Sequence, residues 1–500
     1  MRNTTDKRKT AYIMVQGTMS NAGKSLIAAG LCRVFKQDGF KVCPFKSQNM
    51  ALNSYVTEDN LEMGRAQVMQ AEAAGVKPSV YMNPILLKPT GDMKSQVIVN
   101  GEVYGDMNAK EYFAVKSSFL PDIKAALDKL SEEYEIIVIE GAGSPAEINL
   151  KDNDIVNMGI AKLADAPVIL AADIDRGGVF AQIYGTVMLL DPEEKERVKG
   201  IVINKFRGDK SILDPGIEKT EEMLDIPVCG VLPYMDISLD DEDSLAERLE
   251  NTDCKDIDIA VIRLPHISNF TDFNVFDEFE GVGVRYVKRA SGLKDPDLLI
   301  IPGSKNTIAD MEFLKESGLG EAIRDYAAEG KPVIGICGGY QMLGNEISDP
   351  EGAEGGGSTE GLGLLPVDTK ITGDKKRELC KGRFEKVPGL LKGLSGVKYS
   401  GYEIHMGVSE LVSVSASGFT EGNSGCSLGN VYGTYVHGIF DADRVADEVV
   451  GALYKAKGLS YEAGRVNRKS FKEGEYDKLS DMIRNHMDMD YIYRIMGLKD

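Results

Sequence analysis

Short apolar runs recur along the chain at intervals that leave room for a helix between them. Each run is rich in Ile and Val and ends at Gly, Pro, Asp or a polar turn, which is typical of a strand buried on both faces. The runs cover residues 11–15, 41–44, 136–139, 167–171, 200–203, 259–262, 298–301 and 333–336. Helix-period stretches lie between many of them, as over residues 25–38, 123–133 and 319–329. This alternation predicts βαβ units and parallel sheets, which collect functional groups at the carboxyl ends of their strands.

An acidic stretch divides this alternation into two parts. Residues 236–258 read DISLDDEDSLAERLENTDCKDID, and a new buried strand follows directly. We therefore expect an α/β protein with two doubly wound, mostly parallel-sheet domains, an acidic linker between them and a helical C-terminal appendage. The predicted division is 1–240, 241–256, 257–445 and 446–500. The glycine-rich segment 351–360, EGAEGGGSTE, is expected to be a mobile loop that does not pack.

The amino-acid composition limits the kinds of molecule that the protein is expected to bind. The 500 residues include 58 Lys and Arg against 78 Asp and Glu, a formal net charge of −20, so the chain is a poor general binder of nucleic acid or anionic membrane. An anionic substrate must therefore meet a local basic pocket. The 7 scattered cysteines, without a CxxC pair, exclude a disulfide scaffold and fit a reducing compartment. Because the sequence shows neither a signal-peptide core nor an apolar run of membrane-spanning length, we expect a cytoplasmic protein.

A glycine-rich loop joins the first predicted strand to the first predicted helix. Residues 17–25 read GTMSNAGKS. Such a loop points backbone N–H groups at a phosphate, and the helix dipole adds to the attraction. Lys24 would reach the terminal phosphates of ATP, and the Ser25 hydroxyl would bind Mg²⁺. The predicted phosphate-binding residues are Gly17, Thr18, Asn21, Ala22, Gly23, Lys24 and Ser25.

Polar residues at other strand ends support this site. Glu140 follows a buried run and precedes a Gly-Ala-Gly turn, where its carboxylate could bind Mg²⁺ or the water around it. Asn204 ends another run and could read an adenine edge, although a turn position explains it equally well. Asp173 and Asp175 could contact metal or the acceptor substrate, or could cap the next helix.

A cysteine in a tight turn indicates a second site. Residues 335–339 read GICGG between a buried run and a helix, which is the pattern of a nucleophile elbow. Cys337 is the predicted nucleophile, since a helix N-terminus favours the thiolate, and His437 is the predicted base. Taken alone, each could be an ordinary core residue. The backbone N–H groups of Gly303, Ser304 and Gly338 form the predicted oxyanion hole.

Together these motifs resemble known families. The cysteine elbow with a later His is similar to the flavodoxin-like domain of class I glutamine amidotransferases, and the loop resembles that of dethiobiotin synthetase-type ATPases, which are P-loop NTPase-like. One chain with both in this order resembles the cobyrinate amidotransferases of cobalamin biosynthesis. Further motifs support the resemblance in order: PFKSQNM at 44–50, EMGRAQ at 62–67, MNPILLKP at 82–89, SQVI at 95–98, EGAGSP at 140–145, DIDRGG at 173–178, NKFRGD at 204–209, SNFTDF at 268–273 and GYEIHMG at 401–407.

This resemblance implies a function. It implies that carboxylates b, d, e and g of adenosylcobyrinic acid a,c-diamide are amidated, with glutamine hydrolysed at Cys337 and His437 and an acyl phosphate formed from ATP. The implied ligands are ATP with Mg²⁺, L-glutamine and a polycarboxylate corrinoid, without a tightly bound organic cofactor, nucleic acid or membrane. Lys46 and Arg176 are the favoured cations for the acceptor. Ammonia would need a sheltered path between the domains.

The sequence departs from the family pattern at two places. Class I amidotransferases usually carry His-x-Glu, whereas Gly438 and Ile439 follow His437, so a backbone carbonyl or Glu403 could orient the ring instead. His266 stands where we expect Arg, which would make an anion contact there pH-dependent.

Other activities stay open. A cobyrinic acid a,c-diamide synthase uses the same chemistry on an earlier substrate, and an amidoligase could act on a cell-wall precursor carboxylate. A pseudo-amidotransferase would have the same residues without the activity. A ParA/MinD-like switch fits less well, because the loop lacks the extra Lys near its start and a switch has no use for Cys337 and His437.

Overall fold

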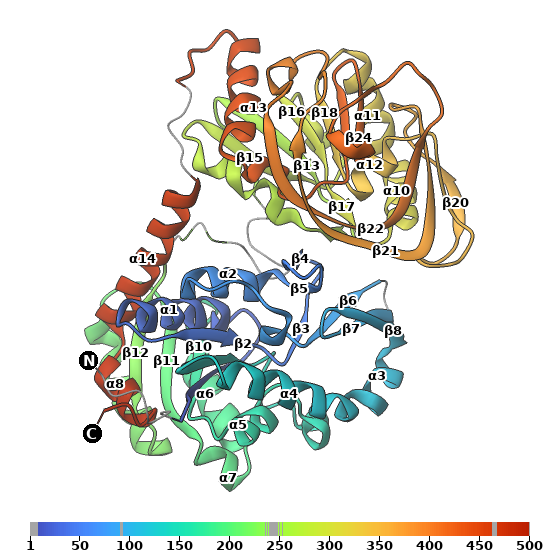
Figure 1. The fold of residues 1–500 in the computed structure, drawn as a ribbon. Helices are drawn as coiled ribbons and strands as arrows, with labels where there is room; N and C mark the ends of the chain where they lie inside the picture. Colours follow the sequence, from blue (N-terminus) through green and yellow to red (C-terminus); the bar gives the residue numbers. More distant parts are fainter. Residues whose placement is uncertain are drawn as a thin grey trace, which may run out of the picture.

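The structure consists of two α/β units. It is a computed structural model that describes residues 9–90, 94–235, 237, 239, 249, 251–252, 254–462 and 468–499. Figure 1 shows the N-terminal half of the chain in the lower unit and most of the C-terminal half in the upper one. The predicted α/β class with two mostly parallel sheets is confirmed.

A six-stranded sheet forms the centre of the lower unit. Its order is β12-β11-β10-β1-β9-β2, and all neighbouring strands are parallel. The strands are β1 (Ala11–Gly17), β2 (Val42–Phe45), β9 (Ile136–Glu140), β10 (Val168–Asp173), β11 (Val198–Phe206) and β12 (Val228–Pro233). Because β1 lies between β9 and β10, the loop after β1 opens at the same edge as the ends of both neighbours.

Alternate strand residues fill two separate cores, one on each face of this sheet. In β1, Met14 belongs to one core, whereas Ile13 and Val15 belong to the other. The first core takes apolar residues from α4 (Leu120–Ser131), α5 (Met158–Ala164), α6 (Val179–Met188) and α8 (Lys210–Leu224). The second takes them from α1 (Lys24–Gln37), from α2 (Arg65–Ala74) and from helices at the end of the chain. Helices therefore cover both faces, as a doubly wound fold requires.

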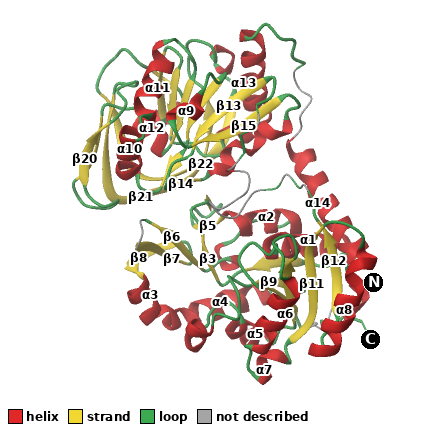
Figure 2. Ribbon diagram, turned by 180° about the vertical axis from the view of Figure 1, so that it is seen from behind, coloured by secondary structure: helices red, strands yellow, loops and turns green. Residues whose placement is uncertain are grey.

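The end of the chain completes the second core. The last helices are α13 (Asp443–Ala456), α14 (Arg468–His486) and α15 (Met489–Ile495). Leu479 and Ile483 of α14 are fully buried in the core that α1 shares, and Figures 1 and 2 show α14 beside α1 and β12. Val449 of α13 is buried in the core of the upper unit. The structure thus differs from the single appendage expected over 446–500, because its helices divide between the two units.

A small sheet of the lower unit faces the upper unit. Its order is β3-β6-β7-β8, and a hairpin of β4 and β5 lies beside it (Figure 1). The elements are β3 (Gln48–Met50), β4 (Ser54–Val56), β5 (Glu62–Gly64), β6 (Ile85–Pro89), β7 (Lys94–Val99), β8 (Glu102–Asn108) and α3 (Ala109–Val115). Hydrogen bonds join the hairpin to the upper unit: the Ser54 N–H donates to Asn269 Oδ1 at 2.9 Å, and the Tyr402 hydroxyl donates to the Ser54 carbonyl at 3.0 Å.

The upper unit is built on a seven-stranded sheet. Its order is β15-β13-β16-β18-β25-β24-β23, and the first five strands are parallel. The strands are β13 (Ile257–Ile262), β15 (Val282–Val287), β16 (Leu298–Ile301), β18 (Val333–Ile336), β23 (Ser417–Gly418), β24 (Gly425–Leu428) and β25 (Val431–Thr434). The helices include α10 (Thr307–Glu316), α11 (Leu319–Ala328) and α12 (Gly338–Met342). Figure 2 shows the sheet between helices.

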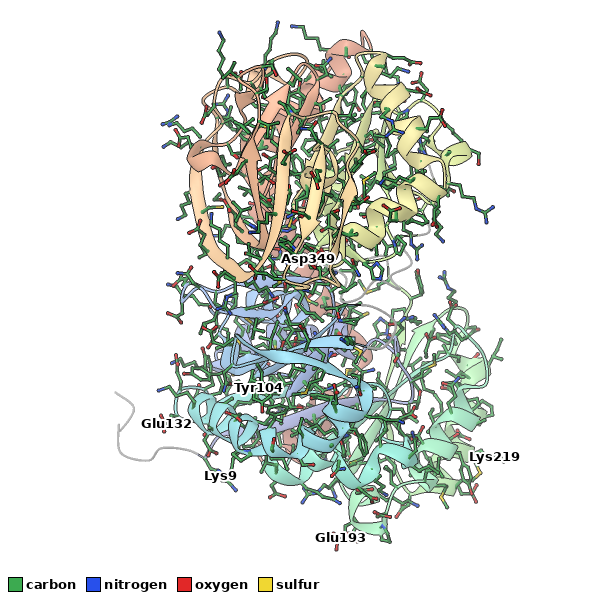
Figure 3. The ribbon with its side chains drawn as sticks, turned by 90° about the vertical axis from the view of Figure 1, so that its right-hand side faces the viewer. Lys9, Tyr104, Glu132, Glu193, Lys219 and Asp349 are labelled. Carbon is green, nitrogen blue, oxygen red and sulfur yellow. The ribbon has the colours of Figure 1, made fainter. Side chains whose placement is uncertain are left out.

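A second, four-stranded sheet of the upper unit corrects one prediction. Its order is β20-β19-β21-β22, formed by β19 (Glu346–Asp349), β20 (Gly357–Glu360), β21 (Val367–Arg383) and β22 (Lys398–Leu411). The expectation that residues 351–360 do not pack is wrong, since β20 pairs with β19. The buried Asp349 carboxylate, labelled in Figure 3, accepts from the N–H groups of Ala353, Glu354 and Gly356 at 2.9, 2.7 and 2.8 Å. The turn needs glycine at residues 355–357, because their φ angles are 111°, 82° and 95°, values that other residues rarely adopt.

Two further expectations concern regions that the structure describes only in part. Most of the predicted acidic linker, 241–256, lies outside the described residues, so the domain boundaries stay a prediction. Within the described ranges, none of the helices has the length and apolar character needed to span a membrane.

The close contact between α1 and α14 generates a stability prediction. A Cβ atom on Gly30 of α1 would lie 2.6 Å from Ile483 Cγ1. We expect G30A to lower the apparent Tm of the full chain, because Ile483 must move. In an I483A background the loss should be much smaller, because only Leu479 Cγ, 3.2 Å away, still crowds the added Cβ and Ala stabilises a helix by about 0.5–1 kcal/mol relative to Gly. Thermal unfolding followed by circular dichroism measures both effects.

G474A in α14 is the matched control. Nothing lies within 4 Å of a Cβ at Gly474, so this variant should be neutral or stabilising in both backgrounds. Equal effects of G30A with and without Ile483 would contradict the packing described here.

Candidate functional site

Cys337 occupies a strained turn between β18 and α12. Its φ is 51° and its ψ is −108°, in the positive-φ region that a non-glycine residue adopts at a cost of about 1–3 kcal/mol. Its N–H donates to the Thr434 carbonyl of β25 at 2.8 Å, and its side chain is 6% exposed. The turn therefore has the strained geometry of a nucleophile elbow, held at the carboxyl edge of the sheet.

The glycines around Cys337 allow close approach to the neighbouring strand. A Cβ on Gly339 would lie 2.0 Å from the Ile301 carbonyl oxygen, and one on Gly338 would lie 2.8 Å from the Ser304 nitrogen. A Cβ on Gly303 would lie 3.1 Å from Cε1 of His437. The structure thus brings Gly303, Ser304 and Gly338 together beside the elbow, as the oxyanion-hole prediction expects. Gly303 and Ser304 form β17, which pairs with β14 (Ile267–Ser268).

The side chain that orients His437 is Asp272, which the sequence left without a role. Asp272 lies in η5 (Phe270–Glu278), within the quoted SNFTDF motif. Its Oδ2 lies 2.7 Å from His437 Nδ1, and its Oδ1 accepts from the Gly438 N–H at 2.9 Å. Burial disfavours a charged His437, but the charges of Asp272 and Cys337 outweigh it and raise the pKa of His437 to about 10. Cys337, His437 and Asp272 thus form one coupled, buried group.

Two other residues singled out in the sequence have different partners. Glu403, a suggested orienting group, lies 3.1 Å from His405 Nε2 and 2.6 Å from Lys376 Nζ. His266 Nδ1 lies 2.8 Å from Asp310 Oδ1.

A cavity opens beside Cys337 at the junction of the two units. Its volume is about 30 Å³. The upper unit contributes Cys337, His437, Ser304 and Lys305 to its lining, and Lys88 of β6 comes from the lower unit.

The phosphate-binding loop connects β1 to α1, as predicted. Lys24 is 7% exposed, and its Nζ donates to the carbonyls of Met19 and Gly143 at 3.1 and 3.2 Å. Asn21 and Gly23 both have positive φ, of 61° and 93°. The Asn204 amide donates to the Ala22 carbonyl at 3.0 Å, so here it supports the loop. Thr18 Oγ1 donates to Gln182 Oε1 at 3.3 Å.

Glu140 joins the groups at the base of this loop. Its Oε1 accepts from Ser25 Oγ at 2.8 Å and from Lys46 Nζ at 2.9 Å, and its Oε2 accepts from Gln70 Nε2 at 2.6 Å. A hydroxyl and a carboxylate in hydrogen-bond contact are donors that fit Mg²⁺, which takes one or two protein ligands and completes its shell with phosphate and water. The described residues hold no cluster of three or more His, Cys, Asp or Glu suited to a metal.

The two aspartates after β10 have basic partners. Asp173 Oδ2 lies 3.0 Å from Lys205 Nζ, and its Oδ1 accepts from the Asp175 N–H at 2.8 Å. Asp175 Oδ1 lies 3.2 Å from Nε of Arg207. Arg176 is exposed and does not line either of the two cavities described here.

A much larger cavity opens on the phosphate-binding loop. Its volume is about 750 Å³. Lys24 and Lys46 line it, together with Lys94, Lys116 and Lys151. Tyr112, Phe113 and Leu87 add apolar surface. The cavity therefore suits a large, partly apolar anion beside a nucleotide.

Comparison with known families agrees with this division of sites. Residues 13–244 match the family described as the CobQ/CobB/MinD/ParA nucleotide binding domain. Residues 258–445 match the family described as the CobB/CobQ-like glutamine amidotransferase domain.

Curated relatives match the chain almost from end to end. The cobyric acid synthase of Ruminiclostridium cellulolyticum is 55% identical over 97% of this chain and 96% of its own length. That of Lachnoclostridium phytofermentans is 54% identical over 97% and 98%, and that of Caldanaerobacter subterraneus subsp. tengcongensis is 50% identical over the same shares. At this identity and coverage, the chain belongs to the cobyric acid synthase family.

Proposed function

We propose that this chain is an ATP- and glutamine-dependent amidoligase that converts carboxylates b, d, e and g of adenosylcobyrinic acid a,c-diamide to amides. The large cavity at the phosphate-binding loop carries the proposal. Its volume of about 750 Å³ and its lysine lining suit a macrocyclic polycarboxylate, whereas the cavity at Cys337 brings the thiol, His437 and buried charges together for glutamine. We assign ATP-dependent activation to residues 1–240 and glutamine hydrolysis to residues 257–445.

Glutamine hydrolysis proceeds through a thioester. Cys337 Sγ attacks the side-chain amide carbon of glutamine, and the N–H groups at Gly303, Ser304 and Gly338 bind the developing oxyanion. As the C–N bond breaks, His437 gives its proton to the leaving ammonia. His437 then takes a proton from the water that hydrolyses the thioester to glutamate. Asp272 holds the ring in the orientation for both transfers.

ATP activates the acceptor, because a carboxylate at neutral pH is a poor electrophile. The γ-phosphoryl group passes to a corrinoid carboxylate oxygen and leaves ADP, and ammonia then displaces phosphate from the acyl phosphate. Lys24 and the loop N–H groups bind the phosphates. Ser25 and Glu140 would hold Mg²⁺, which supplies positive charge against the phosphates when bound. Lys46, paired with Glu140 and lining the cavity, would orient the acceptor carboxylate; Arg176 has no such position.

Strand β6 lies between the cavity at Cys337 and the large cavity. Lys88 of β6 lines the cavity at Cys337, whereas its neighbours Leu87 and Pro89 line the large cavity. Successive strand residues point to opposite faces, so the two cavities lie on opposite sides of β6. Ammonia that passes from one cavity to the other would therefore need to cross only the sheet that contains β6.

The assigned reaction is tested by mass spectrometry of adenosylcobyrinic acid a,c-diamide incubated with the protein, ATP, Mg²⁺ and glutamine. Four successive carboxyl-to-amide conversions are expected. C337A should lose glutamine-supported amidation but retain the reaction supported by ammonium at alkaline pH. K24M should lose both, yet still release ammonia from glutamine.

Other products would redirect the assignment. Two amides added to cobyrinic acid, with the a,c-diamide unchanged, would identify a diamide synthase. If neither corrinoid reacts while glutamine is hydrolysed, the acceptor is not a corrinoid.

Asp272 generates a pH-dependence prediction for glutamine hydrolysis. In the native protein the raised pKa of His437, about 10, keeps its imidazolium charged up to that pH. D272N removes the carboxylate charge, so the pKa of His437 should fall and the basic limb of the kcat/KM profile should move to lower pH. We expect activity at neutral pH to fall about 10²-fold or more, as for loss of an oriented acid–base group.

E403Q is the matched control, because Glu403 contacts His405 but is not a partner of His437. Its basic limb should stay in place. A shifted limb in E403Q, or an unshifted one in D272N, would contradict the role given to Asp272.

A further inference from the structure

The cavity at Cys337 contains an unpaired buried ammonium group. Lys305 follows β17 directly, is 7% exposed and lines the cavity. Its backbone N–H donates to the His266 carbonyl, but its ammonium has neither a hydrogen bond nor an ion pair with any residue in the described ranges. Leaving a charge buried without a partner costs several kcal/mol, so such groups are normally paired. The position of Lys305 therefore calls for an anion in the cavity.

A carboxylate stands in the same cavity, close enough to attract the Lys305 ammonium but without forming a contact ion pair with it. Glu354 also lines the cavity, yet the two side chains form no ion pair with each other. The Asp349-capped turn delivers Glu354 there, and its Oε2 accepts from the Thr307 N–H at 3.0 Å. Burial lowers the pKa of Lys305 and raises that of Glu354, so each charge would gain from a partner of opposite sign.

The other charged groups around the cavity are paired with one another. Glu62 Oε1 lies 2.8 Å from Lys88 Nζ, and Glu62 Oε2 lies 2.5 Å from Lys375 Nζ. His405 contacts the Gly407 carbonyl at 2.7 Å and Glu403 at 3.1 Å. Lys305 and Glu354 are thus the cation and the anion that remain for a ligand.

We infer that Lys305 binds the α-carboxylate of glutamine and Glu354 binds its α-ammonium group, so that the side-chain amide is presented to Cys337. This inference rests on the proposed hydrolysis of glutamine in this cavity. A free α-amino acid carries both charges on one carbon, two methylene groups away from the amide. A cavity in which one cation and one anion are left without an ion-pair partner beside a nucleophile therefore selects free glutamine over amides that lack either charge.

Substrate analogues test each contact separately. 4-Aminobutanamide lacks the α-carboxylate of glutamine, and glutaramic acid lacks the α-amino group. Ammonia release is measured as kcat/KM on all three compounds. K305M should lower kcat/KM for glutamine and glutaramic acid about 10- to 100-fold, the loss expected for a charged hydrogen bond, and change 4-aminobutanamide little. E354Q should lower kcat/KM for glutamine and 4-aminobutanamide and change glutaramic acid little.

Conservative and surface variants complete the test. K305R keeps the charge and should keep most of the preference for glutamine over 4-aminobutanamide. K370M, which removes an exposed lysine of β21 in the same unit, should leave all three values unchanged. If K305M does not unfold cooperatively, K305R and E354Q carry the test.

The outcomes separate this inference from the proposed function. If K305M lowers kcat/KM equally for all three compounds, Lys305 stabilises the oxyanion or the fold, and the inference is overturned. A native protein that hydrolyses none of them would instead overturn glutamine hydrolysis itself.

Discussion

The carboxylate of Glu62 joins the two units. It is fully buried, and it pairs with Lys88 of its own unit and with Lys375 of the other. Burial alone would raise its pKa, but the two ammonium groups more than offset this and hold the pKa well below its usual range. Removing one member of such a cluster costs about 3–5 kcal/mol, because the rest stay buried without neutralisation. The charges are satisfied only in one docked arrangement.

Both cavities depend on that arrangement. Lys88 and Lys375 line the cavity at Cys337, and the strand that carries Lys88 also lines the large cavity. The hairpin that carries Glu62 is fixed to the upper unit by Ser54 and Asn269. Under the proposed function, the unit that uses the ammonia therefore closes the site for glutamine. The same docking of the two units would then position one reaction and shield the other.

The sequence predicted the sites that are formed by residues close together in the chain. It did not predict the contacts between residues that are far apart in the chain. The phosphate-binding loop and the elbow at Cys337 each lie within a few residues, where glycine spacing dictates the backbone. Asp272 stands 165 positions from His437, and the only sign of it in the sequence was a motif to which no role was given.

The glycines at 355–357 were predicted to form a loop that does not pack, because nothing in their composition reveals that Asp349 holds their turn. Arg176 was selected by motif alone, and it is exposed and lines neither of the two cavities.

The return of α14 to the first unit has a consequence for synthesis on the ribosome. The first sheet is complete at Pro233, but the helix that covers its second core ends only at His486. At 5–20 residues per second, the chain between these points takes roughly 10–50 s to make. During that interval the side of α1 that later packs against α14 has no cover from its own chain. The domain that is synthesised first is therefore the last to complete its core. The length of the second domain sets the delay before α14 can pack against it.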